Sequence, residues 1–286
     1  MLISLVDMNN KAYRKSGGPN ITNNAHFSTI KVLAALFFGF LMGVAAGLIG
    51  VGGGEFRIPI LLYVLGLSVV VAVTVNLLVG LLTVVVSFLR RFQFGSLDTR
   101  AINIALVMSL GSIVGAYIGA LLTKKIPEKP LKKVLAIFLV IVGLKIGLEP
   151  FIQTPSLFHF TLSLLEEVIL ATSVGIVIGI ISGTLGVAGG EFRIPALIYL
   201  FNFDIIIAGT TSLLVSIPTV AMGFTKHYHM GHTNQSTNII AIIMGIGSVL
   251  GALIGASYAS TVDKDILKIL LGTILILATI RMLTKP

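Results

Sequence analysis

Four charged residues stand within long apolar stretches of this sequence, and they form two identical pairs. Glu55 precedes Arg57 by two positions, and Glu191 precedes Arg193 by the same spacing. An ionisable side chain at membrane depth is costly, and it usually marks a substrate path or a proton relay. The planar guanidinium group of arginine can hold two oxygens of an oxyanion and stays charged. The pairs therefore predict a site for a small anion, in which each carboxylate either fixes its arginine or titrates as a coupling group.

Each charged pair follows a glycine-rich stretch, residues 50–54 and residues 186–190, which we name the first and the second elbow. Glycine permits positive φ and leaves backbone N–H groups uncovered. Such groups at the start of a helix attract anions. The alternative is a tight turn at the membrane surface, where each glutamate only neutralises its arginine. The predicted anion cradle consists of Gly52, Gly53 and Gly54 in the first elbow, and Gly189 and Gly190 in the second.

Polar residues in the next apolar runs are expected to complete the site. Thr74 and Asn76 stand at the same places in their run as Thr210 and Ser212 in theirs, and Thr211 lies between the latter two. Their side chains can hydrogen-bond an anion or a neighbouring helix. The same sequence offers no cofactor signature, so the predicted ligand is the anion itself, with a proton or cation as the coupled species.

The two charged pairs belong to an internal repeat. Gly50-Val-Gly-Gly-Gly-Glu-Phe-Arg-Ile-Pro59 returns as Gly186-Val-Ala-Gly-Gly-Glu-Phe-Arg-Ile-Pro195, a shift of 136 positions that aligns the remainder without a gap. We therefore predict a duplicated unit. The expected organisation is a flexible basic tail at 1–30, a first transmembrane repeat at 31–149, a linker at 150–163 and a second transmembrane repeat at 164–286.

The composition indicates an all-α polytopic membrane protein. Hydrophobic residues make up 56% of the 286 positions and charged residues 11%, whereas a soluble domain carries about twice that share of charge. Two apolar stretches, about 56–67 and 192–203, are too short for a comfortable crossing and are predicted to be half-helices. The eight runs long enough to cross fall at about 31–50, 69–90, 99–123, 131–148, 167–185, 205–225, 236–259 and 266–283.

The charges at the ends of these runs predict how the chain sits in the cell membrane. If each half-helix carries the chain across, the second repeat is inverted, and the basic N-terminal tail and the lysine-rich segment 124–133 share the cytoplasmic side. Arg90, Arg91 and Arg100 then lie outside. If the half-helices dip and return, the two largest basic clusters fall on opposite sides. The positive-inside bias favours inversion, and it leaves the oligomeric state open.

Several other function classes are disfavoured. The net charge of +9 resides in tails and short loops, which indicates topology and not nucleic-acid binding. Cysteine is absent, and no nucleophile elbow, Walker loop, HExxH or dinucleotide fingerprint occurs, so we predict no enzyme. His227, His229 and His232 crowd one segment, but a metal site needs a closed ligand set, and we interpret them as solvated loop residues.

Glycines at four-residue spacing mark one further pair of helices as closely packed. A ladder of small residues lets two backbones approach inside a bilayer, and we predict a structural role for it. The two ladders are Gly111, Gly115 and Gly119 in the first repeat and Gly247, Gly251 and Gly255 in the second.

The repeated element Gly-Val-Gly-Gly-Gly-Glu-Phe-Arg-Ile-Pro resembles the sulfite exporter TauE/SafE family of membrane permeases. The motif Ala208-Gly-Thr-Thr-Ser-Leu213 and the loop Phe92-x-x-Gly95-x-x-Asp98 resemble the same family, and the likeness covers residues 31–284. It implies secondary transport of a sulfur-containing anion such as sulfite or an organosulfonate, often as export. Because paired broken helices build many transporter sites near the midplane, we predict alternating access around a midplane site between the two repeats. The remaining alternative is a membrane enzyme or receptor-like protein that uses the same pocket without transport.

Overall fold

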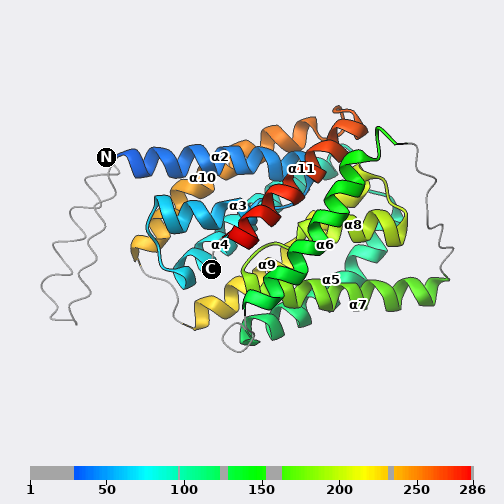
Figure 1. Cartoon of the computed structure of the whole chain (residues 1–286), viewed down its shortest axis with the longest axis horizontal. Helices are drawn as coiled ribbons and strands as arrows, with labels where there is room; N and C mark the ends of the chain where they lie inside the picture. Colours follow the sequence, from blue (N-terminus) through cyan, green and yellow to red (C-terminus); the bar gives the residue numbers. More distant parts are fainter. Residues whose placement is uncertain (1–28, 96, 123–127, 153–162, 231–234, 285–286) are drawn as a thin grey trace, which may run out of the picture.

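The computed structural model describes residues 29–95, 97–122, 128–152, 163–230 and 235–284, and in these ranges the chain contains helices and no strand. The predicted tail and most of the predicted linker lie outside the described residues. The first repeat contains α2 (Thr29–Ile49), α3 (Gly54–Pro59) with the π-helix η1 (Ile60–Val64), α4 (Val69–Phe92), α5 (Thr99–Leu122) and α6 (Glu128–Leu148). The second contains α7 (Leu164–Leu185), α8 (Gly190–Phe201), α9 (Ile205–His229), α10 (Gln235–Tyr258) and α11 (Lys264–Thr284) (Figure 1).

The predicted helices are present, with ends displaced by a few residues. Capping side chains explain two of these ends. Ser163 starts α7 through a reciprocal capping box with Glu166, and the Asp204 carboxylate accepts from two amides of the first turn of α9. Both short apolar stretches are helical, and α3–η1 and α8 occupy equivalent places in the two repeats.

Within the part of the chain that the structure describes, six helices are long and apolar enough to cross a membrane: α2, α4, α5, α7, α9 and α10. The other two long helices, α6 and α11, have 21 residues each and pack against one another. A multi-pass helical membrane protein is therefore confirmed, and the total of eight full crossings stays a prediction.

Helices of one repeat pack closely against helices of the other. The first helix of each repeat packs along the fourth helix of the other, so that α2 lies against α10 and α7 lies against α5. A Cβ atom added to Gly43 would lie 2.2 Å from the carbonyl oxygen of Ser248, and one added to Gly115 would lie 2.2 Å from that of Ile176. The predicted glycine ladders are thus packing faces. Their partners are matching ladders on α2 and α7, which the sequence analysis did not include.

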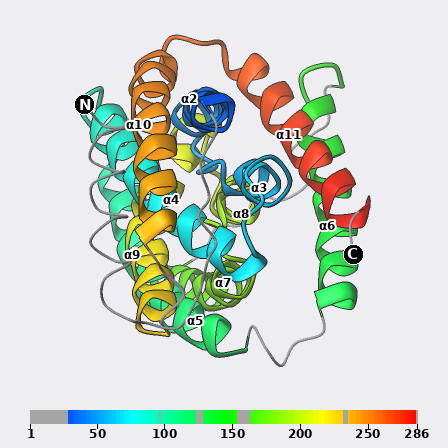
Figure 2. The ribbon, with the colours of Figure 1, turned by 90° about the vertical axis from the view of Figure 1, so that its left-hand side faces the viewer.

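The short helices occupy the centre of the molecule. Viewed end-on, α3 and α8 lie between the group formed by α10, α4, α9 and α5 on one side and the pair α6 and α11 on the other (Figure 2). In Figure 1, α2 begins at the left and α7 begins at the right, so these equivalent helices run in opposite directions. Long helices therefore surround both elbows and hold them away from the outer surface.

Candidate functional site

The two elbows touch each other. A Cβ atom on Gly190 would meet the carbonyl oxygen of Val51 at 2.4 Å, and one on Gly52 would meet the Cβ of Ala188 at 2.7 Å. Glycine at both positions allows this approach, because any larger side chain would push the two backbones apart. The residues that the sequence assigned to one site from two distant segments are thus brought together.

Each elbow also contacts a long helix of the other repeat. Asn76 on α4 donates a hydrogen bond of 2.7 Å to the carbonyl oxygen of Gly186, while Gly50 packs against Gly209 near the start of α9. The centre of the molecule is therefore built from four segments, two from each repeat.

The short helices start in the same way. Gly53 and Gly189 are their N-terminal caps, with φ of 70° and 77°, and neither helix start has a side-chain cap. Left-handed backbone of this kind suits glycine. The first-turn amide groups of α3 and α8 are thus left to the elbow region, as the predicted anion cradle requires.

Arg193 is fully buried and uses only part of its guanidinium group. Its Nη1 donates to the carbonyl oxygens of Ser212 at 3.2 Å and Ala188 at 3.4 Å, and to Ser216 Oγ at 2.7 Å. Its Nε and Nη2 have no hydrogen-bond partner in the structure. A buried arginine with unpaired donors is costly, so these N–H groups are available to an anion.

Arg57 is equally buried but fully engaged. Its Nε donates to the carbonyl oxygen of Gly53 at 3.2 Å, its Nη1 donates to Thr83 Oγ1 at 3.1 Å, and its Nη2 donates to the carbonyl oxygen of Gly52. The Thr83 hydroxyl lies 2.7 Å from the Ser248 hydroxyl on α10. Arg57 therefore links the first elbow to α4 by hydrogen bonds. Because all three guanidinium nitrogens are bonded, Arg57 can act on the centre of the molecule only through the electrostatic field of its charge.

Glu55 and Glu191 follow the two touching elbows, and their carboxyl groups are close enough to interact electrostatically. Both residues are buried, with 7% and 2% of their surface exposed. Both Glu55 oxygens and Oε2 of Glu191 have no hydrogen-bond partner in the structure. These contacts include no ion pair between Glu55 and Arg57, or between Glu191 and Arg193.

Unpartnered polar atoms collect on the predicted site residues. Thr211 Oγ1, Ser212 Oγ and Asn76 Oδ1 are buried without a hydrogen-bond partner, as are the atoms of Arg193 and the two glutamates given above. Thr210 differs because its hydroxyl donates to the carbonyl oxygen of Ile206 in its own helix. Thr74 is also buried. Native proteins satisfy most buried polar groups, so this cluster indicates a place for a polar ligand.

A buried polar stripe on each of the central long helices α4 and α9 was not predicted from the sequence. Both stripes recur at spacings of three, four or seven, the period of one helix face. Counting at these spacings along the sequence from Asn76 and from Ser212 would have identified the other members of each stripe. The buried polar members are Asn76, Thr83, Ser87 and Arg91 on α4, and Ser212, Ser216, Thr219 and His227 on α9. Gly80 and Gly223 lie on the same two faces.

Arg91 and His227 end the two stripes at equivalent positions of the repeat, with 1% and 3% of their surface exposed. Arg91 lies in the last turn of α4 and donates to the carbonyl oxygen of Ile206 at 3.3 Å. The solvated-loop interpretation is therefore wrong for His227, because α9 continues to His229 and buries this side chain. His232 lies outside the described residues, which contain no group of three or more potential metal ligands.

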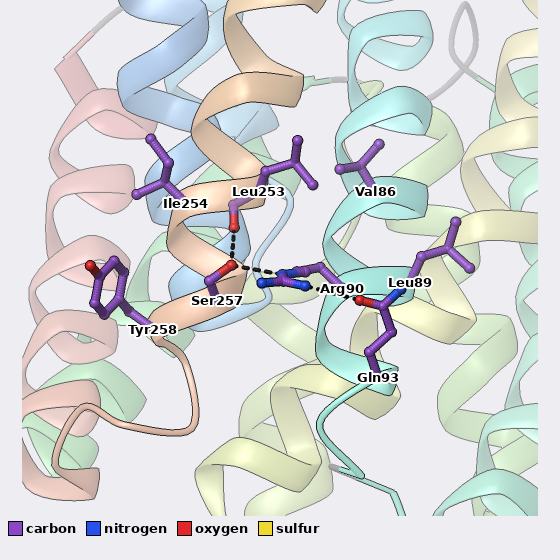
Figure 3. A pocket seen from close by; sticks show the side chains of 8 residues that line it. All are labelled: Val86, Leu89, Arg90, Gln93, Leu253, Ile254, Ser257 and Tyr258. Carbon is purple, nitrogen blue, oxygen red and sulfur yellow. Dashed lines mark hydrogen bonds between the residues drawn. The ribbon is translucent and has the colours of Figure 1, made fainter.

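A groove of about 860 Å³ lies apart from the elbows, between the C-terminal ends of α4 and α10. Arg90 crosses it, donating to Ser257 Oγ at 2.8 Å and to Gln93 Oε1 at 3.1 Å (Figure 3). None of the predicted site residues lines this groove, so it is distinct from the central cluster.

Two helical repeats whose helices pack against one another, buried broken segments and a central polar cluster define a polytopic membrane protein of the transporter class. The model of the family described as "Sulfite exporter TauE/SafE" matches residues 1–146 and 157–286. The chain belongs to this family.

Named relatives agree with that assignment. The chain is 24% identical over 260 residues to "Probable membrane transporter protein YunE" of Bacillus subtilis, covering 84% of this chain and 92% of the relative. It is 28% identical over 272 residues to "Probable membrane transporter protein ORF9" of Sinorhizobium sp, covering 91% and 94%. It is 27% identical over 253 residues to "Probable membrane transporter protein MJ0441" of Methanocaldococcus jannaschii, covering 84% and 91%. No solved structure matches the chain.

Proposed function

We propose that this protein is a secondary transporter of a small oxyanion, sulfite or an organosulfonate, that binds between the two elbows. The observation that carries the proposal is the cluster of buried, unpartnered polar atoms contributed by both repeats. A bare anion at mid-bilayer loses several kcal/mol or more of hydration. The unpaired donors of Arg193, the hydroxyl groups of Thr211 and Ser212, and the first-turn amide groups of α3 and α8 can replace that hydration.

The two stripes supply a route to such a site. The α4 stripe leads from Asn76 toward Arg91, and the α9 stripe leads from Ser212 toward His227. In Figure 1, α4 and α9 run in opposite directions, so the stripes lead to opposite ends of the molecule. This geometry supports alternating access, in which one stripe at a time connects the elbows to water.

The same directions support an inverted pair of repeats in the cell membrane. The first helices of the two repeats, α2 and α7, begin at opposite ends of the molecule. Lys31 and Lys133 then share one side, which the positive-inside bias makes cytoplasmic. Arg100 and Glu167, joined by an ion pair of 2.5 Å, lie on the other side.

The test is flux and binding measured on the same preparation. Purified protein in liposomes should move labelled sulfite or methanesulfonate saturably, and the detergent-solubilised protein should bind the same anions. Saturable binding without flux would instead favour a receptor-like or enzymatic use of the pocket. Absence of both would refute an anion site at the elbows.

A further inference from the structure

We infer that Glu55 and Glu191 form one proton-binding unit, and that each monovalent anion enters the elbow site together with one proton. The inference rests on the proposed function, because it concerns the same site. It goes further by giving the coupled ion, the stoichiometry and the electrical character of transport.

The first step is the interaction between the two carboxyl groups. Each glutamate is the second residue of its short helix, and the elbows before them touch at Val51 and Gly190. The two carboxyl groups come from different repeats, both are buried beside the touching elbows, and they interact electrostatically. Two carboxylates that both carry a charge repel, whereas a pair that shares a proton forms a hydrogen bond. Two neighbouring carboxyl groups can therefore hold one shared proton between them.

The second step is a count of buried charge. The charged groups that act on the carboxyl pair are Arg57, from α3, and Arg193, from α8. With both carboxyl groups ionised, the four side chains sum to zero. One proton raises the sum to +1, and a bound monovalent anion returns it to zero. Since uncompensated buried charge is unfavourable, proton and anion are expected to bind and leave together.

The third step concerns the other titratable groups on the surrounding helices. Arg91, from α4, acts on Asp204 at the start of α9 and not on the carboxyl pair. Tyr199, from α8, is acted on by Glu149 at the end of α6. His227 is the one remaining buried group on α9 whose side chain ordinarily titrates near neutral pH. It is the competing proton carrier that an experiment must separate from the glutamates.

The experiment counts protons taken up when methanesulfonate binds to purified protein in weak buffer. This anion is a suitable probe because it stays monovalent across the neutral range, so all uptake belongs to the protein. We expect about one proton per bound anion, and an affinity that rises up to about tenfold per unit fall in pH. The Glu191→Gln and Glu55→Gln variants should bind with pH-independent affinity and little proton uptake.

Matched variants identify the group responsible. Glu167→Gln removes a carboxylate of similar type that is paired with Arg100 at the protein surface, and it should leave the proton count unchanged. His227→Gln should also leave it unchanged. Loss of proton uptake in His227→Gln, with normal uptake in the glutamate variants, would overturn the inference. Glu191→Asp tests whether a restored carboxyl group restores the proton count.

Wild-type protein alone provides a second readout. One proton moving with one monovalent anion carries no net charge, so flux in liposomes should respond to an imposed pH gradient and ignore an imposed membrane potential. Binding or flux without proton uptake would refute the carboxyl-pair inference and leave anion transport standing. Absence of binding and flux for both methanesulfonate and sulfite would refute the proposed function itself.

Discussion

The two repeats share a nearly identical motif but use its arginine differently. Arg57 places all three guanidinium nitrogens in bonds to the protein, whereas Arg193 leaves Nε and Nη2 without a partner. One position accounts for much of this difference. Ser216 accepts from Arg193 Nη1, but the equivalent Gly80 has no side chain, and Arg57 extends to Thr83 instead. The duplicated motif therefore contains one arginine that is fully hydrogen-bonded at its elbow and one that keeps unpaired donors.

The largest expected effect separates these two arginines. Arg193→Gln should lower anion affinity by roughly 10- to 100-fold, because it removes charge-assisted hydrogen bonds worth about 1.5–3 kcal/mol. Arg57→Gln should cost less affinity and more thermal stability, because two elbow carbonyl groups lose their donor. Binding titrations and melting curves on both variants measure this, with the exposed Arg100→Gln as control. Equal affinity losses in the two variants would break the comparison.

A second test adds one methyl group to equivalent glycines. The new Cβ in Gly190→Ala would meet the Val51 carbonyl oxygen at 2.4 Å, while that in Gly54→Ala would meet Asn76 Nδ2 at 2.8 Å. A side chain can move aside more easily than a backbone, and overpacking costs about 1–3 kcal/mol. Gly190→Ala should therefore reduce stability and flux more. Thermal unfolding and liposome flux would show the reverse order if the elbows were loosely packed.

A third test makes the second repeat resemble the first. Ser216→Gly removes the hydroxyl group that accepts from Arg193 Nη1 at 2.7 Å. The freed guanidinium should shift, and anion affinity should change by a few-fold, in line with about 0.5–1.5 kcal/mol for one hydrogen bond. Thr219→Ala is the control, because that hydroxyl donates to Val215 within its own helix. Affinity that responds only to Thr219→Ala would contradict the assigned contact.

The smallest expected effects concern the end of α9. His229→Ala should change stability by no more than about 0.5 kcal/mol, as is usual for surface substitutions, because His229 is exposed. His227→Ala should destabilise the protein measurably, since His227 is buried like its counterpart Arg91. Melting temperatures of the two variants decide this, and equal values would restore the solvated-loop interpretation for both residues. We expect saturable transport in each.

Much of the fold follows from local patterns. Apolar run lengths predicted the ten helical segments of the described residues, because a helix in a bilayer must satisfy its own backbone and span a set thickness. The 136-residue repeat identified equivalent elbows, and charged residues within apolar surroundings marked Glu55, Arg57, Glu191 and Arg193 as candidates. All four are buried, and they lie in the first turns of the short helices α3 and α8.

Tertiary structure alone decided which partners those residues meet. The packing of α2 and α7 against helices of the other repeat and the approach of the two elbows depend on contacts between segments far apart in the sequence. Whether a buried guanidinium keeps free donors depends on which hydroxyl or carbonyl group a neighbouring helix presents, as Ser216 and Gly80 illustrate. Local periodicity contains no such information. It could name Glu55 and Glu191 as candidates, but only the fold brings together the two elbows that precede them.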